Sequence, residues 1–502
     1  MSRARLSDLW PPLLGGLVAL AAAVLLRTIA DTRLLAEVSL DAMVSVLPGK
    51  DFSSLLGVFG PYGKALSFSS TLVAQLVVYV AVWLGLRRVA GPDAETGRLA
   101  IAAGLLATLV FLFAAIVLVS ATDATLGRDT GWGGFAFATL MFSAIYAGIA
   151  GFQSLGSGAE AEPEGVTGPS RRQVLLRIPG FALGGLALIV LGRTLRETAG
   201  GGVQRSRRGT PTPEVTPNSE FYVVSKNYID PAPNGDAWRL KIDGYTQKAL
   251  TLTYQDMLAM PSQEQYTTMQ CISNEVGGEL IGNALWRGVP LKTVLEMAGI
   301  RSDAYWVFFR CEDDYTESIP LEFALRDQVI LAYQMNGEPL PKKHGFPIRL
   351  LSPGKYGIKH PKWIVEILLL PDERIGYWQQ QGWTREGRMN TTVRIDVPGG
   401  APQPVGPLVI QGVSFSGDRG INRVEISTDN GKTWKDATLK PPLSPYTWVH
   451  WEHDWQNPPA GTSILLARAT DGTGQLQAEY DLDPFPDGAS GFHKVIATVE
   501  EA

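Results

Sequence analysis

Long apolar runs fill the first 200 positions of the chain, whereas short alternating apolar and polar runs fill the rest. A helix needs about 20 mainly apolar residues to cross a bilayer. Five segments meet or approach this length: Leu13–Ala30, Leu66–Leu86, Leu99–Ser120, Gly133–Phe152 and Val174–Leu191. The pattern therefore predicts an α-helical membrane region with about five transmembrane helices over residues 1–195.

Arginine clusters predict how these helices are oriented. If the helices alternate in direction, Arg3, Arg5, Arg87, Arg88, Arg98, Arg171 and Arg172 all fall on one side. The positive-inside rule makes that side cytoplasmic, so the large C-terminal half is expected on the extracytoplasmic side of a bacterial membrane. Arg193, Arg196, Arg205, Arg207 and Arg208 follow the fifth segment and conflict with the rule.

A short motif addresses this conflict. Ser170-Arg171-Arg172-Gln173 precedes the fifth apolar segment and resembles a twin-arginine export signal, a route for proteins already folded around a cofactor. The alternative is that two arginines simply mark a cytoplasmic helix end.

The membrane half offers little chemistry of its own. All five histidines lie after residue 340, and Asp31, Asp41, Asp51 and Asp123 are expected in loops or at helix edges. A bis-histidine haem or a chain of ionisable groups is therefore not predicted there. We expect an anchor or docking platform, with a quinone-docking role as the alternative.

The second half reads as a linker and two domains. Residues 196–219 are rich in Gly, Arg, Thr and Pro, which predicts an extended linker. Trp238–Gly244 suggests a strand, and Thr253–Met260 a short helix stopped by Pro261. Leu291–Ala298 suggests a second helix, with Gly299 just past its end.

The texture changes near Val397-Pro398. Short strands are expected over Pro407–Gly412, Ile421–Thr428, Lys432–Thr438 and Ser463–Ala469, and Asp429-Asn430-Gly431 predicts a tight hairpin. The pattern is typical of an immunoglobulin-like β-sandwich. We expect an α+β domain over residues 220–397 and the sandwich over residues 398–502.

Composition excludes several functions. The net charge of −5 gives no indication of a nucleic-acid-binding surface. The chain holds two cysteines, Cys271 and Cys311, and no CxxC or CxxCH motif. Cysteine-rich zinc or iron–sulfur sites and covalent haem in this chain are therefore not predicted.

Two segments carry candidate chemistry. Thr268-Met269-Gln270-Cys271 is strand-like and leads to Gly277-Gly278, so a thiolate at this loop would suit a soft metal; a buried structural cysteine is the alternative. Between positions 344 and 362 the chain gathers cationic and imidazole side chains around two glycines. These are His344, Arg349, Lys355, Lys359, His360 and Lys362. Such a segment suits an anionic ligand such as a phosphate, and a solvated charged loop is the alternative.

Taken together, these motifs resemble a known family. Gln270-Cys271, Met335 to Pro341, His344-Gly345-Phe346-Pro347 and Lys359-His360-Pro361-Lys362-Trp363 look like the ordered signatures of the sulfite oxidase family. The resemblance runs from about Pro217 to the C-terminus. It implies a sulfite-oxidase-type molybdopterin domain followed by a dimerisation domain, and hence a possible homodimer.

The resemblance also implies a molybdenum–molybdopterin cofactor with Cys271 as the metal ligand. Cofactor contacts are implied for Asn227, Tyr228, Asp313, His344, Arg349, Lys359, His360, Pro361 and Lys362. Trp383 stands where sulfite-oxidising members carry an active-site tyrosine, so a catalytic place is implied for it. A small-molecule substrate and a separate cytochrome or quinone-linked electron carrier are expected.

The substrate pocket departs from the family pattern. Asn274-Glu275-Val276 stands where sulfite-oxidising members carry arginine, and Gly488 to Gly491 lacks an expected arginine. Sulfite oxidation is therefore expected to be weak or absent. An S-oxide or N-oxide reductase and a cofactor-free binding module are the two alternatives. A disulfide between Cys271 and Cys311 would consume the ligand, so Cys311 is expected to be a core thiol on a strand.

Overall fold

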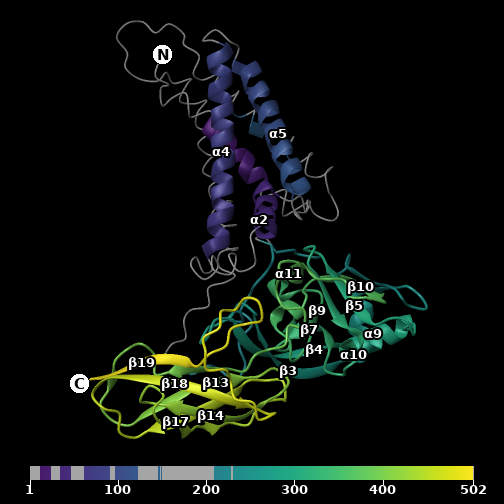
Figure 1. Cartoon of the computed structure of the whole chain (residues 1–502). Coiled ribbons are helices and arrows are strands. Elements are labelled where there is room, and N and C mark those ends of the chain that lie inside the picture. The colour runs from purple at the N-terminus through teal and green to yellow at the C-terminus, as the bar shows by residue number, and fades with distance from the viewer. Residues whose placement is uncertain are drawn as a thin grey trace, which may run out of the picture. The chain divides into compact units, whose positions relative to one another are not determined.

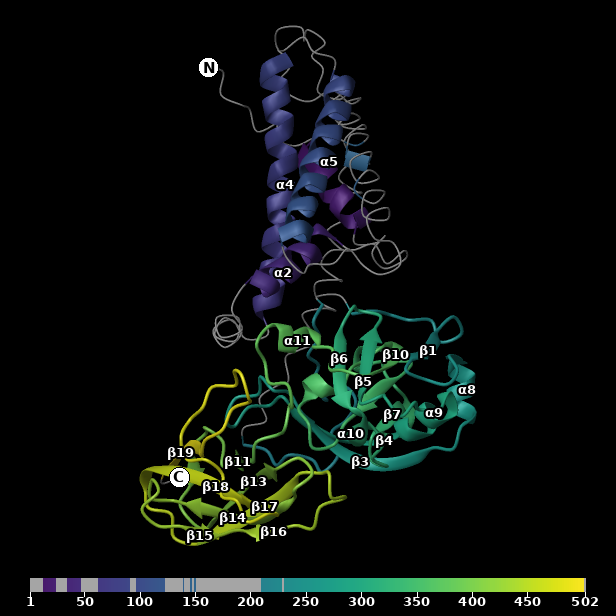
Figure 2. The same cartoon turned by 45° about the vertical axis from the view of Figure 1, so that its right-hand side comes forward.

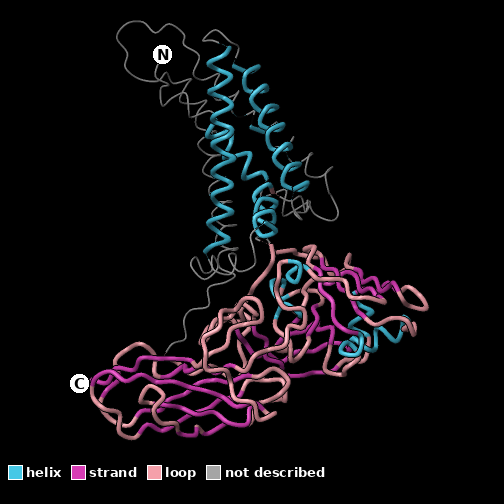
Figure 3. Tube along the Cα trace, viewed as in Figure 1, coloured by secondary structure: helices cyan, strands magenta, loops and turns pink. Residues whose placement is uncertain are grey.

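The computed structural model describes residues 12–23, 34–46, 62–90, 96–121, 139, 145–146, 149, 209–227 and 230–500. The chain divides into two compact units. One comprises the N-terminal helices, and the other comprises nearly all of the described residues from 209 onward. Figure 3 shows helices in the described part of the first unit and mainly strands and loops in the second.

Two long helices of the N-terminal unit match predicted spans. Helix α4 (Tyr62–Ala90) and helix α5 (Thr96–Ala121) contain the windows Ser69–Ala90 and Arg98–Val117, which are long and apolar enough to cross a membrane. The first predicted span corresponds to the shorter apolar helix Pro12–Ala23. The fourth and fifth, with the twin-arginine motif, lie almost wholly outside the described residues. The predicted number of five spans is therefore not confirmed.

Helix α2 (Leu35–Val46) was not expected from the sequence. Asp41 lies within it, so the expectation that this aspartate sits in a loop or at a helix edge is wrong. Together with α4 and α5, this helix encloses a small apolar core in which Tyr79 stacks on Tyr146 with ring centroids 4.4 Å apart.

Two sheets form the first part of the second unit, one mixed and one antiparallel (Figures 1 and 2). One sheet has the order β2-β1-β10-β5-β6, and the other has the order β3-β4-β7-β8 with β9 also paired to β7. The first sheet contains β1 (Arg239–Gly244), β2 (Leu250–Thr253), β5 (Trp306–Cys311), β6 (Thr316–Pro320) and β10 (Ile364–Leu370). The second contains β3 (Gln263–Gln270), β4 (Ile281–Pro290), β7 (Ile330–Met335), β8 (Glu338–Pro339) and β9 (Arg349–Leu351).

Short helices complete this region. Helix α8 (Tyr254–Ala259) begins at Thr253, which forms a capping box with Asp256. Helix α9 (Leu291–Ala298) ends at Gly299, whose φ of 73° suits a residue without a side chain. Both confirm the predicted helices. The remaining short helices are α10 (Leu321–Ala324), α11 (Tyr377–Gln380), η1 (Lys342–His344) and η2 (Gly357–Lys359).

One apolar core fills the space beside these sheets. It joins buried residues of β1, β5 and β10 to those of α9 and β7, including Leu240, Val294, Phe309 and Leu331. Cys311 is fully buried in this core on β5 and forms no disulfide with Cys271, as expected.

The C-terminal region is built from two further sheets, β11-β13-β17-β16 and β12-β19-β18-β14-β15. Their strands are β11 (Thr392–Val397), β12 (Gln403–Pro404), β13 (Leu408–Phe415), β14 (Ile421–Ser427), β15 (Lys435–Asp436), β16 (Thr438–Leu439), β17 (Val449–Trp455), β18 (Gly461–Asp471) and β19 (His493–Glu500). Buried residues from both sheets share one core. A β-rich C-terminal region is thus confirmed, and its immunoglobulin type stays a prediction.

The predicted hairpin is present in this region. Strand β14 pairs antiparallel with β15, and Asn430 and Gly431 between them have φ values of 60° and 84°. Positive φ at consecutive positions is what Asn-Gly sequences tolerate, so the local turn chemistry was informative.

Hydrogen bonds cross both predicted domain boundaries, at residues 219 and 398. Strand β11 pairs with β13, so the C-terminal region begins before residue 398. The described end of the predicted linker, residues 209–219, packs on the second unit instead of standing free. Thr212 Oγ1 donates to Asp396 Oδ2 at 2.7 Å, and the Thr216 amide donates to the Asn283 carbonyl at 2.7 Å. Composition alone does not reveal these hydrogen bonds.

Candidate cofactor site

Cys271 lies where β3 ends and an irregular loop begins. Its amide donates to the Leu280 carbonyl at 2.9 Å, which closes the loop, and its Sγ lies 3.0 Å from Ser273 Oγ. The side chain is buried, with 7% of its surface exposed. The fold therefore presents a buried thiol on a short, closed loop.

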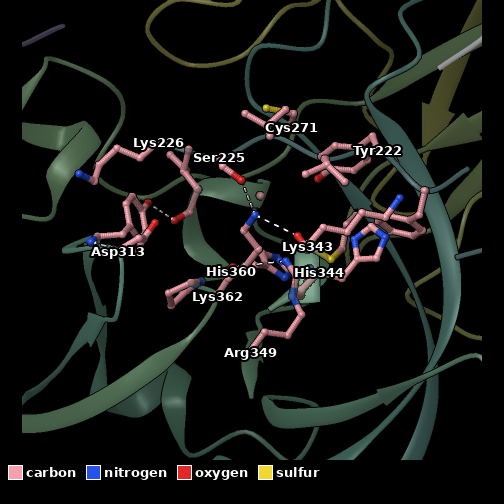
Figure 4. A pocket seen from close by; sticks show the side chains of 18 of the residues that line it. Tyr222, Ser225, Lys226, Cys271, Asp313, Lys343, His344, Arg349, His360 and Lys362 are labelled. Carbon is pink, nitrogen blue, oxygen red and sulfur yellow. Dashed lines mark hydrogen bonds between the residues drawn. The ribbon is translucent and has the colours of Figure 1, made fainter. Parts of the chain in front are cut away.

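This thiol lines an open cleft with a volume of about 680 Å³, which includes the solvent-filled space at its mouth. Figure 4 shows Cys271 at one side of the cleft, with charged and imidazole side chains across from it. The lining residues that carry polar side chains are Tyr222, Ser225, Lys226, Cys271, Asp313, Tyr315, Lys343, His344, Arg349, His360 and Lys362. Segments far apart in the sequence thus meet at one site.

Cations dominate the charge of the cleft. Arg349 donates to the carbonyls of His344 at 3.1 Å and His360 at 3.3 Å, and its burial lowers its pKa to about 10. Lys362 Nζ donates to Ser225 Oγ at 2.7 Å and to the Lys343 carbonyl at 3.2 Å, and burial lowers the pKa of this amine. Lys226 and Lys343 add two more cations against one carboxylate, Asp313. The cleft suits an anion.

The two histidines are held neutral. Burial lowers the pKa of each to about 3. His344 Nε2 lies 3.0 Å from the Asn218 carbonyl, so this nitrogen must carry the proton and donate. His360 Nε2 donates to the Lys355 carbonyl at 3.1 Å, while its Nδ1 accepts from the Ser352 amide at 3.3 Å. Both ring nitrogens of His360 are thus already engaged by backbone.

Asp313 is the acidic group of the cleft. Burial raises its pKa to about 6, against the opposing pull of Lys226 and Lys362. Its Oδ1 accepts from the Tyr315 amide at 3.1 Å, which fixes the carboxyl group at the turn between β5 and β6.

The structure gathers most of the predicted site residues, with exceptions. Cys271, Asp313, His344, Arg349, His360, Pro361 and Lys362 all line the cleft. Asn227 is buried and is absent from the lining, while Tyr228 lies outside the described residues. Lys359 is 3% exposed and pairs with Glu317 at 2.7 Å.

Trp383 is also absent from the lining. Its side chain packs in an apolar cluster with Ile272 and Phe485. Ile272 directly follows Cys271 in the chain, but this cluster lies outside the set of residues that line the cleft. Its catalytic place therefore stays a prediction.

Sequence reasoning missed Tyr222, Ser225, Lys226 and Lys343. The first three lie on a stretch without regular secondary structure, so neither periodicity nor a motif marked them. The adjacent Asn227 and Tyr228, for which cofactor contacts were implied, were the nearest signal. Lys343 precedes His344 in η1 and could have been included from its position alone.

Two buried donors indicate what the cleft accepts. Arg349 Nε and Tyr222 Oη are buried, and neither has a hydrogen-bond partner within the described part of the chain. Leaving such groups unsatisfied costs free energy, so an acceptor-rich ligand in the cleft would stabilise them. Among the described residues, no three His, Cys, Asp or Glu side chains cluster as a metal site. The unsatisfied donors and the cationic lining fit an anionic, acceptor-rich ligand held in the cleft that Cys271 lines.

Known proteins agree with this chemistry. Residues 228–378 match the model of the oxidoreductase molybdopterin binding domain, and residues 390–483 match that of the Mo-co oxidoreductase dimerisation domain. Mitochondrial sulfite oxidase of Mus musculus is 30% identical over 333 residues, which cover 55% of this chain and 60% of the relative. Sulfite oxidase of Gallus gallus is 30% identical over 319 residues, 53% of this chain and 68% of the relative.

A solved structure is similar as well. The sulfane dehydrogenase SoxCD from Paracoccus pantotrophus superposes with a TM-score of 0.52 and 25% identity, over 58% of this chain and 85% of that one. The fold and site thus define a molybdopterin-binding oxidoreductase. The chain belongs to the sulfite oxidase family. It spans about 60% of the length of the rodent relatives that it matches.

Proposed function

We propose that this chain binds a molybdenum–molybdopterin cofactor through Cys271 and catalyses a two-electron oxo transfer. The observation that carries the proposal is a buried thiol facing a cationic cleft in which two buried donors await an acceptor. When bound, the cofactor supplies a metal that exchanges two electrons and one oxygen atom with a substrate. Cys271 ligates as the thiolate, since metal binding displaces the thiol proton.

The residues of the cleft take distinct roles in this proposal. Lys226, Arg349 and Lys362 bind the anionic part of the cofactor. His344 stays neutral and fixes the geometry of η1 through its bond to the Asn218 carbonyl. His360 supports the cleft through backbone bonds and presents its ring as a wall. Asp313 accepts hydrogen bonds from N–H groups of the cofactor.

The positions at which sulfite-oxidising relatives are expected to hold sulfite carry no cationic side chain in this chain. At the positions after Cys271, Asn274 uses its Oδ1 to accept from the Leu280 amide at 2.8 Å, so this side chain serves the loop. Trp383 lies in apolar surroundings. Neither Asn274 nor Trp383 supplies a cation that could hold an oxyanion, and we therefore expect sulfite to be a poor substrate. Turnover of sulfite at the rate of dedicated sulfite oxidases would contradict the proposal.

The reverse reaction is the alternative within the same chemistry. A reductase of S-oxides or N-oxides would use the same residues to remove oxygen from a neutral substrate. Reduced-dye assays with sulfoxides and N-oxides, set beside cytochrome reduction with sulfite, separate the two directions. A cofactor-free binding module is the alternative of another class, and purified protein without molybdenum would favour it.

Placement of the enzyme is also proposed. Helices α4 and α5 are apolar enough to span a membrane, and we place the catalytic unit on the extracytoplasmic side, anchored by the N-terminal helices. A separate electron carrier serves the metal, and the C-terminal region forms a homodimer, as its match to the dimerisation model supports. Reporter fusions after residue 200 and mass measurement in detergent test these two statements.

The experiment that tests the core proposal compares two cysteine variants. Cys271→Ser should lose bound molybdenum and activity, whereas Cys311→Ser should keep both and lose only stability. Equal loss from both variants would contradict the assignment of Cys271 as ligand.

A further inference from the structure

The loop that carries Cys271 is short and closes on itself. The Cys271 amide donates to the Leu280 carbonyl at 2.9 Å, and the Leu280 amide donates to Asn274 Oδ1 at 2.8 Å. The Gly278 amide donates to the Glu275 carbonyl at 2.9 Å. These bonds link the far end of the loop to the backbone of Cys271.

The far end of this loop is held by the C-terminal region. Arg394 on β11 donates from Nη1 to the Gly278 carbonyl at 3.0 Å. The His493 ring on β19 lies so close to Gly277 that a Cβ added there would come within 2.0 Å of Nε2. The ring itself is fixed, because its Nδ1 accepts from the Ile395 amide at 2.9 Å.

Arg394 is locked in this position by two further bonds. Its Nε donates to Asp396 Oδ1 at 2.6 Å, and its Nη2 donates to Thr212 Oγ1 at 2.7 Å. Thr212 in turn donates to Asp396 Oδ2 at 2.7 Å. The Arg394 side chain is 12% exposed and that of Asp396 is 4% exposed, so water competes weakly for these bonds.

Thr212 belongs to the segment that leads from the N-terminal helices to the second unit. The same segment also accepts at the Glu214 carbonyl from Asn283 on β4 and from Trp448, at 2.8 and 3.2 Å. Through Thr212, this segment takes part in the bonds that hold Arg394 against the Cys271 loop.

We propose that Arg394, locked by Asp396 and Thr212, is a positioning residue for Cys271. It acts through the Gly278 carbonyl and is not among the residues that line the cleft. The proposal rests on the function proposed above, in which Cys271 is the metal ligand. Residues that orient metal ligands commonly change metal affinity or activity about 10- to 100-fold when they are lost.

The test measures hydrogen exchange of the full chain in detergent. Arg394→Gln removes the charge-assisted bond to the Gly278 carbonyl. Because such a bond stabilises the closed loop, we expect hydrogen exchange of peptides covering residues 272–280 to become about tenfold faster or more. Thr212→Val should increase the exchange rate of the same peptides by less than Arg394→Gln does. Thr212→Ser keeps the hydroxyl and should exchange at the wild-type rate. The matched control is Arg468→Gln, which breaks a bidentate pair with Glu425 in the same region, away from the loop.

A second readout follows the metal. At equal molybdenum content, Arg394→Gln should shift the visible absorption band of the thiolate–metal bond, and Arg468→Gln should not. Unchanged exchange in Arg394→Gln, an equal increase in Arg468→Gln, or a faster loop with an unshifted band would each overturn the proposal. If Arg394→Gln does not fold, the Thr212 pair of variants decides by exchange. Protein without molybdenum would refute the proposed function alone, because the exchange measurement needs no metal.

Discussion

Lys359 gives the sharpest contrast between a cofactor ligand and a structural group. Its Nζ donates to Glu317 Oε1 at 2.7 Å and to the Ser318 carbonyl at 3.1 Å, and neither charged side chain is more than 3% exposed. Glu317 Oε2 accepts from Gln379 at 3.1 Å. The pair thereby links η2, β6 and α11. Ile358, the neighbour of Lys359 in η2, lines the cleft.

Lys359→Met removes one partner and leaves the Glu317 carboxyl buried without its cation. Breaking a buried ion pair in this way costs about 3–5 kcal/mol. For a unit of this size, that loss lowers the melting temperature by roughly 6–20 °C. Because burial already raises the pKa of Glu317 and favours its neutral form, Glu317→Gln with Lys359→Met should recover much of the loss.

The assay is thermal unfolding of cofactor-free protein, followed by tryptophan fluorescence. Lys359→Met should be much less stable than the wild type, and the double variant should lie between them. If Lys359 contacts the cofactor phosphate instead, the cofactor-free variant will melt with the wild type and only cofactor retention will fall. That result would refute the structural role.

The remaining predictions concern the loop, the cleft and the core. Gly277→Ala should displace the loop, because φ is +71° and His493 blocks the Cβ; faster exchange of residues 272–280 checks this, and an unchanged loop would contradict it. Asp313 has its folded pKa raised to about 6, so its contribution to stability is lost as pH rises from about 4 through 6. This loss amounts to about 3 kcal/mol, and Asp313→Asn should remove that part of the pH dependence in cofactor-free melts; parallel profiles would count against it. Cys311→Ser should lower the melting temperature while molybdenum content stays at the wild-type level, whereas Cys271→Ser should lose the metal without a comparable loss of stability in cofactor-free protein.

Local sequence signals predicted local structure well. Thr253 with Asp256 three residues on, and Gly299 after an apolar helix, mark helix ends through bonds made within a few residues. The Asn430-Gly431 turn is local in the same sense. Cys271 and part of the cationic segment at positions 344–362, which the sequence marked separately, line one cleft in the structure.

Features that depend on distant partners were not predictable in this way. The composition of residues 209–217 predicts a free linker, but in the structure Thr212 donates a hydrogen bond to Asp396, 184 positions away. Lys359 lies in the same cationic segment as Lys362, but its amine pairs with the buried Glu317 and does not line the cleft. Tyr222 enters the cleft from a stretch without regular secondary structure, so no period marked it.

Molybdenum X-ray absorption tests the central claim most directly, because it counts the sulfur atoms bonded to the metal. The account predicts one sulfur neighbour more in the wild-type protein than in any metal retained by Cys271→Ser, because position 271 supplies a thiolate only in the wild type. A sulfur count that is the same in both proteins would contradict the claim that position 271 ligates the metal.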